Sequence, residues 1–349
     1  MFVYWLLFAY FAVGVVLQRD DPRAPRTHAP LLLVVGAVII ALLIGLRFEV
    51  GGDWKAYERI FSLSRYADLG QMLRRGDPAY QLLNWAVERL GGDIWLVNLL
   101  CGTIFAWGLL RFARTQPDPW LAMLIAIPYL VVVVAMGFSR QGVAIGLLMG
   151  GLASLLRGAT IVKFSLYVFV AALFHKTAMV ALVLVLLRGR RSLVINLLFL
   201  AASLWLMYDL LLQDSVDLYV KNYVDSEYGA EGAVIRVAMS FVPALLFLVY
   251  HVRFEMTDDE RAIWRNFSYA TLGLVGLVFL FPSSVVIDRL ALYILPFQLV
   301  VLSRVPGIIV APALGRFVLI LYSLAVQFVW LNYAAHAEYW VPYTFYPGS

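Results

Sequence analysis

Residues 120–156 read WLAMLIAIPYLVVVVAMGFSRQGVAIGLLMGGLASLL, two long apolar runs with the polar triplet Ser139-Arg140-Gln141 between them. An ionisable group inside a bilayer is costly unless it faces a cavity, a partner or a ligand. The pair His175-Lys176 interrupts a second apolar stretch, 161–187, in the same way. Both interruptions indicate a functional site in a membrane protein, and their charge favours an anionic ligand.

The composition of the 349-residue chain indicates a membrane protein rather than a soluble one. Hydrophobic residues make up 63% and charged residues 14%, whereas soluble domains hold roughly 45–50% and 25%. The apolar blocks are continuous and separated by short charged loops, which favours helices over a transmembrane barrel. We therefore predict an all-α polytopic membrane protein. The single cysteine, Cys101, excludes an internal disulfide and a cysteine-based metal site.

The apolar blocks predict about 12 transmembrane helices, with a range of about 10–13 because several blocks are shorter than a usual span. With no linker between blocks, we expect residues 1–349 to form a single integral membrane domain. The first block lacks a basic leader and a cleavage site, so we interpret it as a span. The blocks lie at 2–17, 31–46, 93–112, 120–137, 141–156, 161–174, 177–187, 192–208, 233–252, 266–281, 287–303 and 308–333.

Arginines in the loops predict the topology. If residues 161–187 cross as a hairpin, all the arginine-rich loops fall on one side, which the positive-inside rule makes the cytoplasm. A single span would instead export the cluster Arg188–Arg191 and import the acidic loop 209–232. We therefore predict a hairpin whose turn at His175-Lys176 lies in a polar cavity. Both termini, an amphipathic loop at 47–92 and the acidic loop at 209–232 are then external.

The sequence resembles the EpsG family in short motifs that follow one another in the same order. Where the family usually has Gly-Thr-Asp, this chain has Gly51-Gly52-Asp53. The motifs are Gly45-Leu46-Arg47, Gly51-Gly52-Asp53-Trp54 with Tyr57, Gly76-Asp77-Pro78-Ala79-Tyr80, Arg140-Gln141, Leu173-Phe174-His175-Lys176-Thr177, the segment from Asp288-Arg289 to Pro296, and Trp340-Val341-Pro342-Tyr343.

Proteins of the EpsG family are Wzy-type bacterial polysaccharide polymerases. The resemblance implies a GT-C-like helical fold and a multi-pass protein of the bacterial inner membrane. It also implies metal-independent, inverting transfer of one undecaprenyl-diphosphate-linked oligosaccharide onto another, at an active site that faces the periplasm or exterior. The product would be exopolysaccharide, capsule or O-antigen. A chain-length regulator and a flippase of the same pathway are candidate partners.

Arginines are the first candidates for binding the donor diphosphate. The planar guanidinium binds phosphate bidentately in a partly dehydrated site, so we predict this role for Arg47, Arg140 and Arg289. The alternative for each is an interfacial cation that snorkels to lipid headgroups.

Four further side chains complete the predicted substrate site. Tyr57 belongs to the first external motif, and Gln141 follows Arg140 directly. Tyr293 lies four residues after Arg289 and so shares its helix face, while Lys176 could contact phosphate. The alternatives are a helix-packing amide for Gln141, an interfacial tyrosine for Tyr293 and a snorkelling cation for Lys176.

Glycosyl transfer also needs a base that takes the proton of the acceptor hydroxyl. Asp53 follows two glycines after the second span, where GT-C enzymes carry their catalytic acid. His175 lies deeper, beside a lysine that would lower its pKa. Either residue could be the base; the alternatives are a solvated turn aspartate and a hydrogen-bonded core histidine.

Two acidic segments of the sequence do not point to a specific site. The acidic loop 209–232 could bind an acceptor glycan or be merely solvated. Asp258-Asp259-Glu260 follows Thr257, which predicts a capping box and a short helix through Arg265 rather than a metal site. No phosphate-binding loop, dinucleotide fingerprint or Cys/His cluster occurs in the sequence, so we expect no cofactor, no metal and no nucleic-acid partner.

The sequence therefore predicts a glycosyltransferase that polymerises lipid-linked repeat units. An O-antigen-ligase-like enzyme or a membrane acyltransferase would place similar residues near an outer cavity. A lipid-linked glycan transporter is the other alternative, although the chain has neither the internal repeat nor the two-sided charges expected of one.

Overall fold

The computed structural model describes residues 1–18, 30–187, 231–280 and 285–346. The chain divides into two compact units, one formed by Met1–His175 with Leu302–Ser349 and the other by Lys176–Val301. In the described residues the secondary structure is helical apart from one pair of two-residue strands. A helix satisfies its own backbone hydrogen bonds, which is why long apolar segments adopt it in a bilayer.

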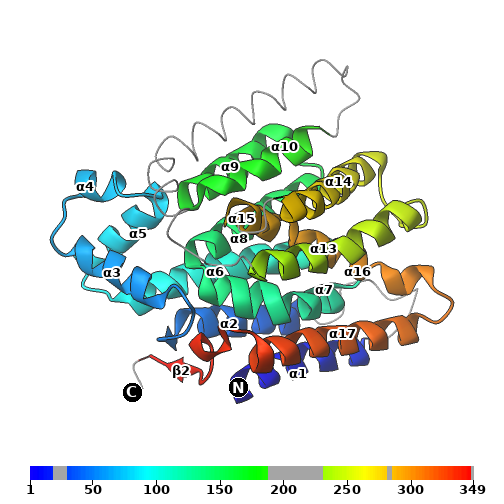
Figure 1. Ribbon diagram of the computed structural model, residues 1–349, viewed down its shortest axis with the longest axis horizontal. Coiled ribbons are helices and arrows are strands. Elements are labelled where there is room, and N and C mark those ends of the chain that lie inside the picture. Colours follow the sequence, from blue (N-terminus) through cyan, green and yellow to red (C-terminus); the bar gives the residue numbers. More distant parts are fainter. Residues whose placement is uncertain (19–29, 188–230, 281–284, 347–349) are drawn as a thin grey trace. The chain divides into compact units, whose positions relative to one another are not determined.

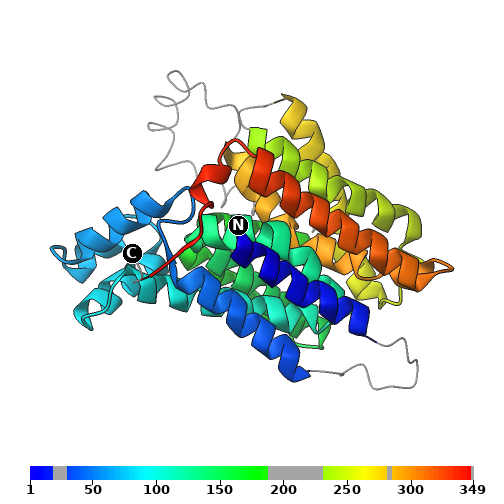
Figure 2. The same ribbon diagram turned by 90° about the horizontal axis from the view of Figure 1, so that it is seen from below.

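The first unit is built on long apolar helices (Figure 1). Helix α1 contacts both α2 and α17 and lies between them in Figure 2. The helices are α1 (Phe2–Leu17), α2 (Pro30–Gly45), α6 (Ile94–Ala113), α7 (Pro119–Ala126), α8 (Ser139–Leu156), α9 (Ile161–Phe174) and α17 (Pro312–Tyr333), with the short helix η3 (Val305–Ile308) before α17.

Residues 47–92 form three short amphipathic helices at one end of the first unit (Figures 1 and 2). They are α3 (Trp54–Ser64), α4 (Leu69–Leu73) and α5 (Pro78–Arg89). Helix α5 contacts α3, α4, α6 and α9. The strand β1 (Arg47–Phe48) precedes them and pairs antiparallel with β2 (Thr344–Phe345), which follows the short helix η4 (Ala337–Tyr339).

The block predicted at 120–137 is a helix that changes type. Helix α7 runs directly into η1 (Ile127–Ala135), a π-helix whose residues are all buried. Pro128 stands near the transition and has no N–H for the α-helical ladder. Phe138 then breaks the helix, and α8 begins at Ser139.

Close packing fixes α8 against its neighbours. A Cβ atom added at Gly108 of α6 would overlap the backbone of Gly146 in α8, so the two helices approach at these glycines. Gly151 of α8 likewise faces Phe164 and Tyr167 of α9. These contacts place the start of α8 beside the first turns of α6, where the candidate site lies.

The second unit contains η2 (Lys176–Met179), α10 (Val180–Leu186), α13 (Glu231–Tyr250), α14 (Asp258–Leu280), α15 (Val285–Ile294) and most of α16 (Pro296–Leu302). Aromatic rings of Phe247, Trp264, Phe267 and Phe297 form its core. The amide of Asn266 donates to the carbonyl of Leu184 (2.9 Å), which ties α14 to α10.

The start of α14 confirms part of the predicted cap and corrects the helix length. The backbone N–H of Glu260 donates to Thr257 Oγ1 (3.2 Å), as a capping threonine requires. The prediction of a separate short helix through Arg265 was wrong, because α14 continues to Leu280. Neither glycine nor proline stands at the junction, so the polar first turns run straight into the apolar block predicted at 266–281.

The helices bear out an all-α membrane protein. In the described residues, five helices are long and apolar enough to span a bilayer: Ile94–Ala113, Ser139–Leu156, Asp258–Leu280, Ile287–Ile308 and Pro312–Tyr333. Shorter apolar helices occupy the other described blocks. The block 192–208 and the acidic loop 209–232 lie outside the described residues. The total of about 12 spans and the GT-C-like arrangement therefore stay predictions.

Candidate functional site

Arg47 lies at the centre of a buried hydrogen-bond network. Its side chain is 1% exposed. The guanidinium donates to the carbonyls of Ile44 and Val50, to Asn98 Oδ1 at 3.1 Å and to Ser139 Oγ at 2.7 Å. Each guanidinium nitrogen therefore has a protein acceptor. The network joins the loop after α2 to α6 and to the first residue of α8.

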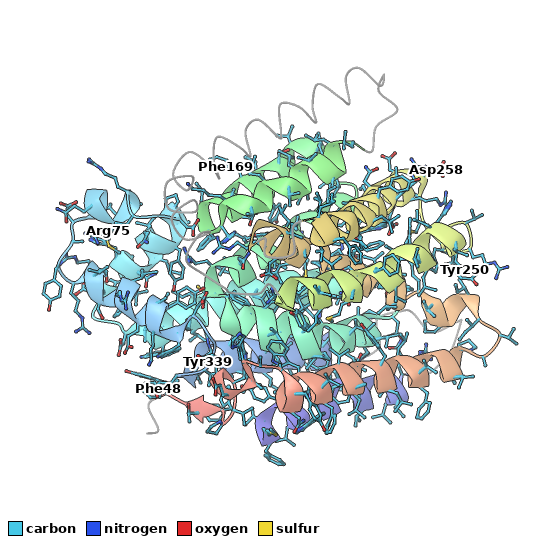
Figure 3. The ribbon with its side chains drawn as sticks, in the orientation of Figure 1. Phe48, Arg75, Phe169, Tyr250, Asp258 and Tyr339 are labelled. Carbon is cyan, nitrogen blue, oxygen red and sulfur yellow. The ribbon has the colours of Figure 1, made fainter. Side chains whose placement is uncertain are left out.

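The loop after Arg47 is also held by the C-terminal segment. Gly51 N–H donates to the carbonyl of Tyr339 (2.7 Å), and Figure 3 shows Phe48 and Tyr339 at the same end of the unit. Trp340 Nε1 donates to the carbonyl of Val132 in the π-helix (2.7 Å). Residues far apart in sequence thus fix the backbone that presents the Gly51-Gly52-Asp53 motif.

Only glycine fits at position 51. Its φ is +106°, a conformation that favours glycine. A Cβ atom there would lie 2.6 Å from the carbonyl oxygen of Met136. The glycine therefore lets the loop rest on the junction between η1 and α8, two residues before Asp53.

Five aspartates stand at helix N-caps in the described part of the first unit, and they divide into two groups. The side chains of Asp68, Asp93 and Asp118 accept backbone N–H bonds from their own helices. Those of Asp53, before α3, and Asp77, before α5, make no such cap bond. An N-cap aspartate ordinarily stabilises its helix by capping. The carboxylates of Asp53 and Asp77 therefore do not cap their own helices.

Asp77 pairs with Arg140 instead. Asp77 Oδ2 lies 2.8 Å from Arg140 Nη1, and the two side chains are 10% and 31% exposed. The Arg140 guanidinium carbon lies 5.9 Å from the ring centre of Tyr57. Arg140 Nε is buried and has no protein hydrogen-bond partner, a state that costs about 1–3 kcal/mol unless a ligand or solvent group binds there.

Tyr57 connects Asp53 with Arg140. It lies one turn after Asp53, to whose carbonyl its N–H donates (3.0 Å). The pKa of Tyr57 is raised to about 12, mainly by burial and to a smaller extent by the charge of Asp53, while Arg140 opposes the rise. The Tyr57 hydroxyl is therefore a neutral donor at physiological pH. Its ring packs edge-on against Tyr80, 5.5 Å between centres.

The buried face of α5 is unusually polar for an amphipathic helix. Tyr80, Gln81 and Asn84 are each at most 4% exposed. Tyr80 Oη, Gln81 Oε1 and Asn84 Oδ1 have no protein hydrogen-bond partner. Since Tyr80 packs on Tyr57, this polar face continues from the Asp77–Arg140 pair. Hydroxyl groups, which donate as well as accept, suit such oxygens.

His175 ends α9 at the same end of the unit. The short loop 157–160 joins α8 to α9, so the two packed helices run antiparallel. With 18 residues in α8 and 14 in α9, His175 lies about one helical turn deeper than Ser139. It is 8% exposed and has extended backbone. Gln141 is buried on α8, and its Nε2 has no protein partner.

The remaining predicted residues belong to the second unit. Lys176 begins η2 and is half-buried, as is Arg289 in α15. Tyr293 lies one turn after Arg289 and is fully buried. In the same unit Arg236 forms a buried ion pair with Asp288. The cluster described above contains first-unit residues only: of the predicted residues, the structure brings together Arg47, Asp53, Tyr57 and Arg140.

Sequence reasoning missed Asp77, Asn98, Ser139 and Tyr80 as members of this cluster. Asp77 and Tyr80 stood in a quoted motif, but an aspartate before a proline at a helix start looks like an ordinary cap. Asn98 was detectable as an amide inside the apolar block 93–112. In the described residues, no three His, Cys, Asp or Glu side chains gather as a metal site would require.

Comparison with known proteins identifies a family. The model of the EpsG family matches residues 31–345. That range includes every residue of the cluster. No curated protein and no solved structure matches the chain.

Proposed function

Because this chain belongs to the EpsG family, a Wzy-type polysaccharide polymerase family, we propose that it polymerises undecaprenyl-diphosphate-linked oligosaccharide repeat units. The family suggests a polymerase role at the inner membrane, and the apolar helices agree with a membrane protein. The product is then exopolysaccharide, capsule or O-antigen.

The observation that carries this proposal is the placement of Arg140. Its part-exposed guanidinium stands at the first turn of α8, beside Asp77 and over Tyr57. A helix N-terminus favours an anion, and a guanidinium adds charge-assisted hydrogen bonds to phosphate oxygens. Arg140 therefore binds the donor diphosphate and stabilises the charge that develops as the diphosphate leaves.

The reaction is an inverting substitution at the anomeric carbon. The acceptor hydroxyl oxygen attacks C1 of the donor sugar, the bond from C1 to the diphosphate oxygen breaks, and undecaprenyl diphosphate leaves with the bonding electrons. Asp53 takes the hydroxyl proton. Its half-exposed carboxylate makes no cap bond and lies one turn from Tyr57, which supports this role. His175, deeper at the same end, is the alternative base.

Other residues hold the substrates in this proposal. Gln141 and Tyr57 contact the donor beside Arg140. The substrate-binding roles of Lys176, Arg289 and Tyr293, which belong to the second unit, stay predictions from the sequence. Arg47 differs: its guanidinium is already bonded to four protein acceptors, so we propose that it fixes the loop that carries Asp53. Transfer is metal-independent and takes place at the external face, with a chain-length regulator and a flippase as partners.

Purified protein in liposomes tests the function when a lipid-linked repeat unit is the only substrate. A ladder of products is expected, and Arg140→Ala should abolish it while Asp68→Asn, a cap variant in α4, should not. A single transfer onto a different acceptor would favour a ligase, and acyl transfer an acyltransferase. Glycan translocation without a ladder would favour a transporter.

A further inference from the structure

The contact between Asp77 and Arg140 uses only part of the guanidinium, and the arginine side chain stays 31% exposed. Asp77 binds at Nη1. Nε is buried and has no protein partner, whereas another part of the side chain is exposed. A guanidinium has five N–H donors, so phosphate oxygens can bind its exposed part while Asp77 stays at Nη1. The diphosphate and Asp77 can therefore share Arg140.

When both groups bind Arg140, the Asp77 carboxylate and the lipid diphosphate are two negative groups next to one guanidinium. The Asp77 carboxylate is 10% exposed, so solvent screens it weakly. It orients the guanidinium, yet it also repels a diphosphate bound to the same guanidinium. Orientation favours the reaction, and repulsion favours departure of the product lipid.

We propose that Asp77 is a positioning residue that orients the guanidinium of Arg140 toward the lipid diphosphate and weakens the binding of undecaprenyl diphosphate after transfer. This inference rests on the proposed function, because it concerns the leaving group of that reaction. It assigns a role to an N-cap aspartate whose carboxylate binds Arg140 and makes no cap bond with its own helix.

Asp77→Asn separates charge from geometry. Asparagine has nearly the size and shape of aspartate, and its amide oxygen can still accept from Arg140. Undecaprenyl diphosphate should bind about tenfold more tightly, as expected for loss of one nearby like charge. Both kcat and KM should fall, with product inhibition. Asp77→Glu, which keeps the charge, should restore wild-type product affinity.

Asp68→Asn is the matched control, because the Asp68 side chain caps α4 in the same segment by accepting the N–H of Gln71. It should leave product affinity unchanged. In an Arg140→Lys background, Asp77→Asn should change product affinity less than in wild type, because the two residues act as a unit.

Equilibrium binding of radiolabelled undecaprenyl diphosphate to the detergent-solubilised full chain is the readout, with unfolding temperature measured in parallel. Inorganic pyrophosphate and phosphatidylglycerol are competitors; displacement by phosphatidylglycerol alone would overturn the proposal. Unchanged or weaker product binding in Asp77→Asn would also overturn it, since a purely structural ion pair gives that result.

The two proposals can fail separately. If wild type makes polymer and Asp77→Asn does not bind the product more tightly, this inference fails and the proposed function stands. If wild type makes no polymer but Asp77→Asn still binds undecaprenyl diphosphate more tightly, the polymerase assignment fails and the role of Asp77 stands.

Discussion

Asp77 and Arg140 lie 63 residues apart in the chain and 2.8 Å apart at their charged atoms. One precedes α5, and the other stands in the first turn of α8. The pair ties the amphipathic segment 47–92 to a helix long enough to span the membrane. It also fixes a half-exposed cation where a helix N-terminus already favours an anion.

Arg140→Lys tests whether the guanidinium fork is needed. Lysine keeps the charge but cannot bind bidentately, so turnover should fall on the order of 10²-fold with an unchanged unfolding temperature. The measurement is initial polymerisation rate. Arg75→Lys, at an exposed position in the same segment (Figure 3), is the control and should be neutral. Near-normal turnover in the Arg140 variant would show that a point charge suffices.

The identity of the base follows from two variants. Asp53→Asn keeps the size but accepts no proton, so single-turnover rate should drop on the order of 10²–10⁴-fold while donor binding persists. His175→Gln should be milder. A more severe loss in the histidine variant would transfer the role to His175. If both keep more than about half of the wild-type rate, the leaving diphosphate or bulk water takes the proton.

Arg47→Lys should damage stability more than donor binding. Lysine cannot reach all the acceptors to which Arg47 donates. The buried oxygens Asn98 Oδ1 and Ser139 Oγ therefore lose the guanidinium as a hydrogen-bond donor. We expect a loss of about 2–4 kcal/mol in the free energy of unfolding. Thermal unfolding measures it, and exposed Arg59→Lys is the control. Weaker donor binding at an unchanged unfolding temperature would instead place Arg47 in the diphosphate site.

Tyr57 should make the protein sensitive to alkaline pH. Its pKa in the folded chain, about 12, exceeds the ordinary value of about 10, so the folded state holds the proton more tightly. This stability is fully present below about pH 10 and is lost as pH rises toward 12. The unfolding temperature of Tyr57→Phe should therefore fall less over that pH range than the unfolding temperature of wild type. Exposed Tyr66→Phe is the control; parallel curves for Tyr57→Phe and wild type would contradict the prediction.

The predicted topology is tested by labelling in whole cells. Single cysteines replace Arg190, Lys221 and Ser349, all outside the described residues, in a chain whose buried Cys101 is changed to Ala. A membrane-impermeant thiol reagent should label positions 221 and 349 from outside and leave 190 unlabelled. External labelling at 190 would contradict the hairpin.

The sequence predicted most of the helical architecture because that depends on local information. Apolar runs must form helices in a bilayer, whatever their neighbours are. The helix interruption at His175 and the threonine cap at Thr257 were also visible as local patterns. The π-helix after Pro128 was not predicted, since a proline within an apolar run is compatible with several helix geometries.

The site was only partly predictable. Sequence alone named Arg47, Asp53, Tyr57 and Arg140 as candidates, and the tertiary structure brought them together. The sequence could not show which aspartates cap a helix and which belong to the site, because all five stand just before a helix. They are Asp53, Asp68, Asp77, Asp93 and Asp118.

The sequence by itself thus determined that the chain forms apolar helices with charged residues at a few interruptions, because hydrophobicity and backbone hydrogen bonding act locally. Only the tertiary structure decided what each charge does. Capping needs only one carboxylate and its own helix. The bond of Asp77 to Arg140 and those of Arg47 to Asn98 and Ser139 instead join residues 51–92 positions apart in the chain. Such contacts depend on how close-packed glycines set the distance between helices, and no local pattern encodes that distance.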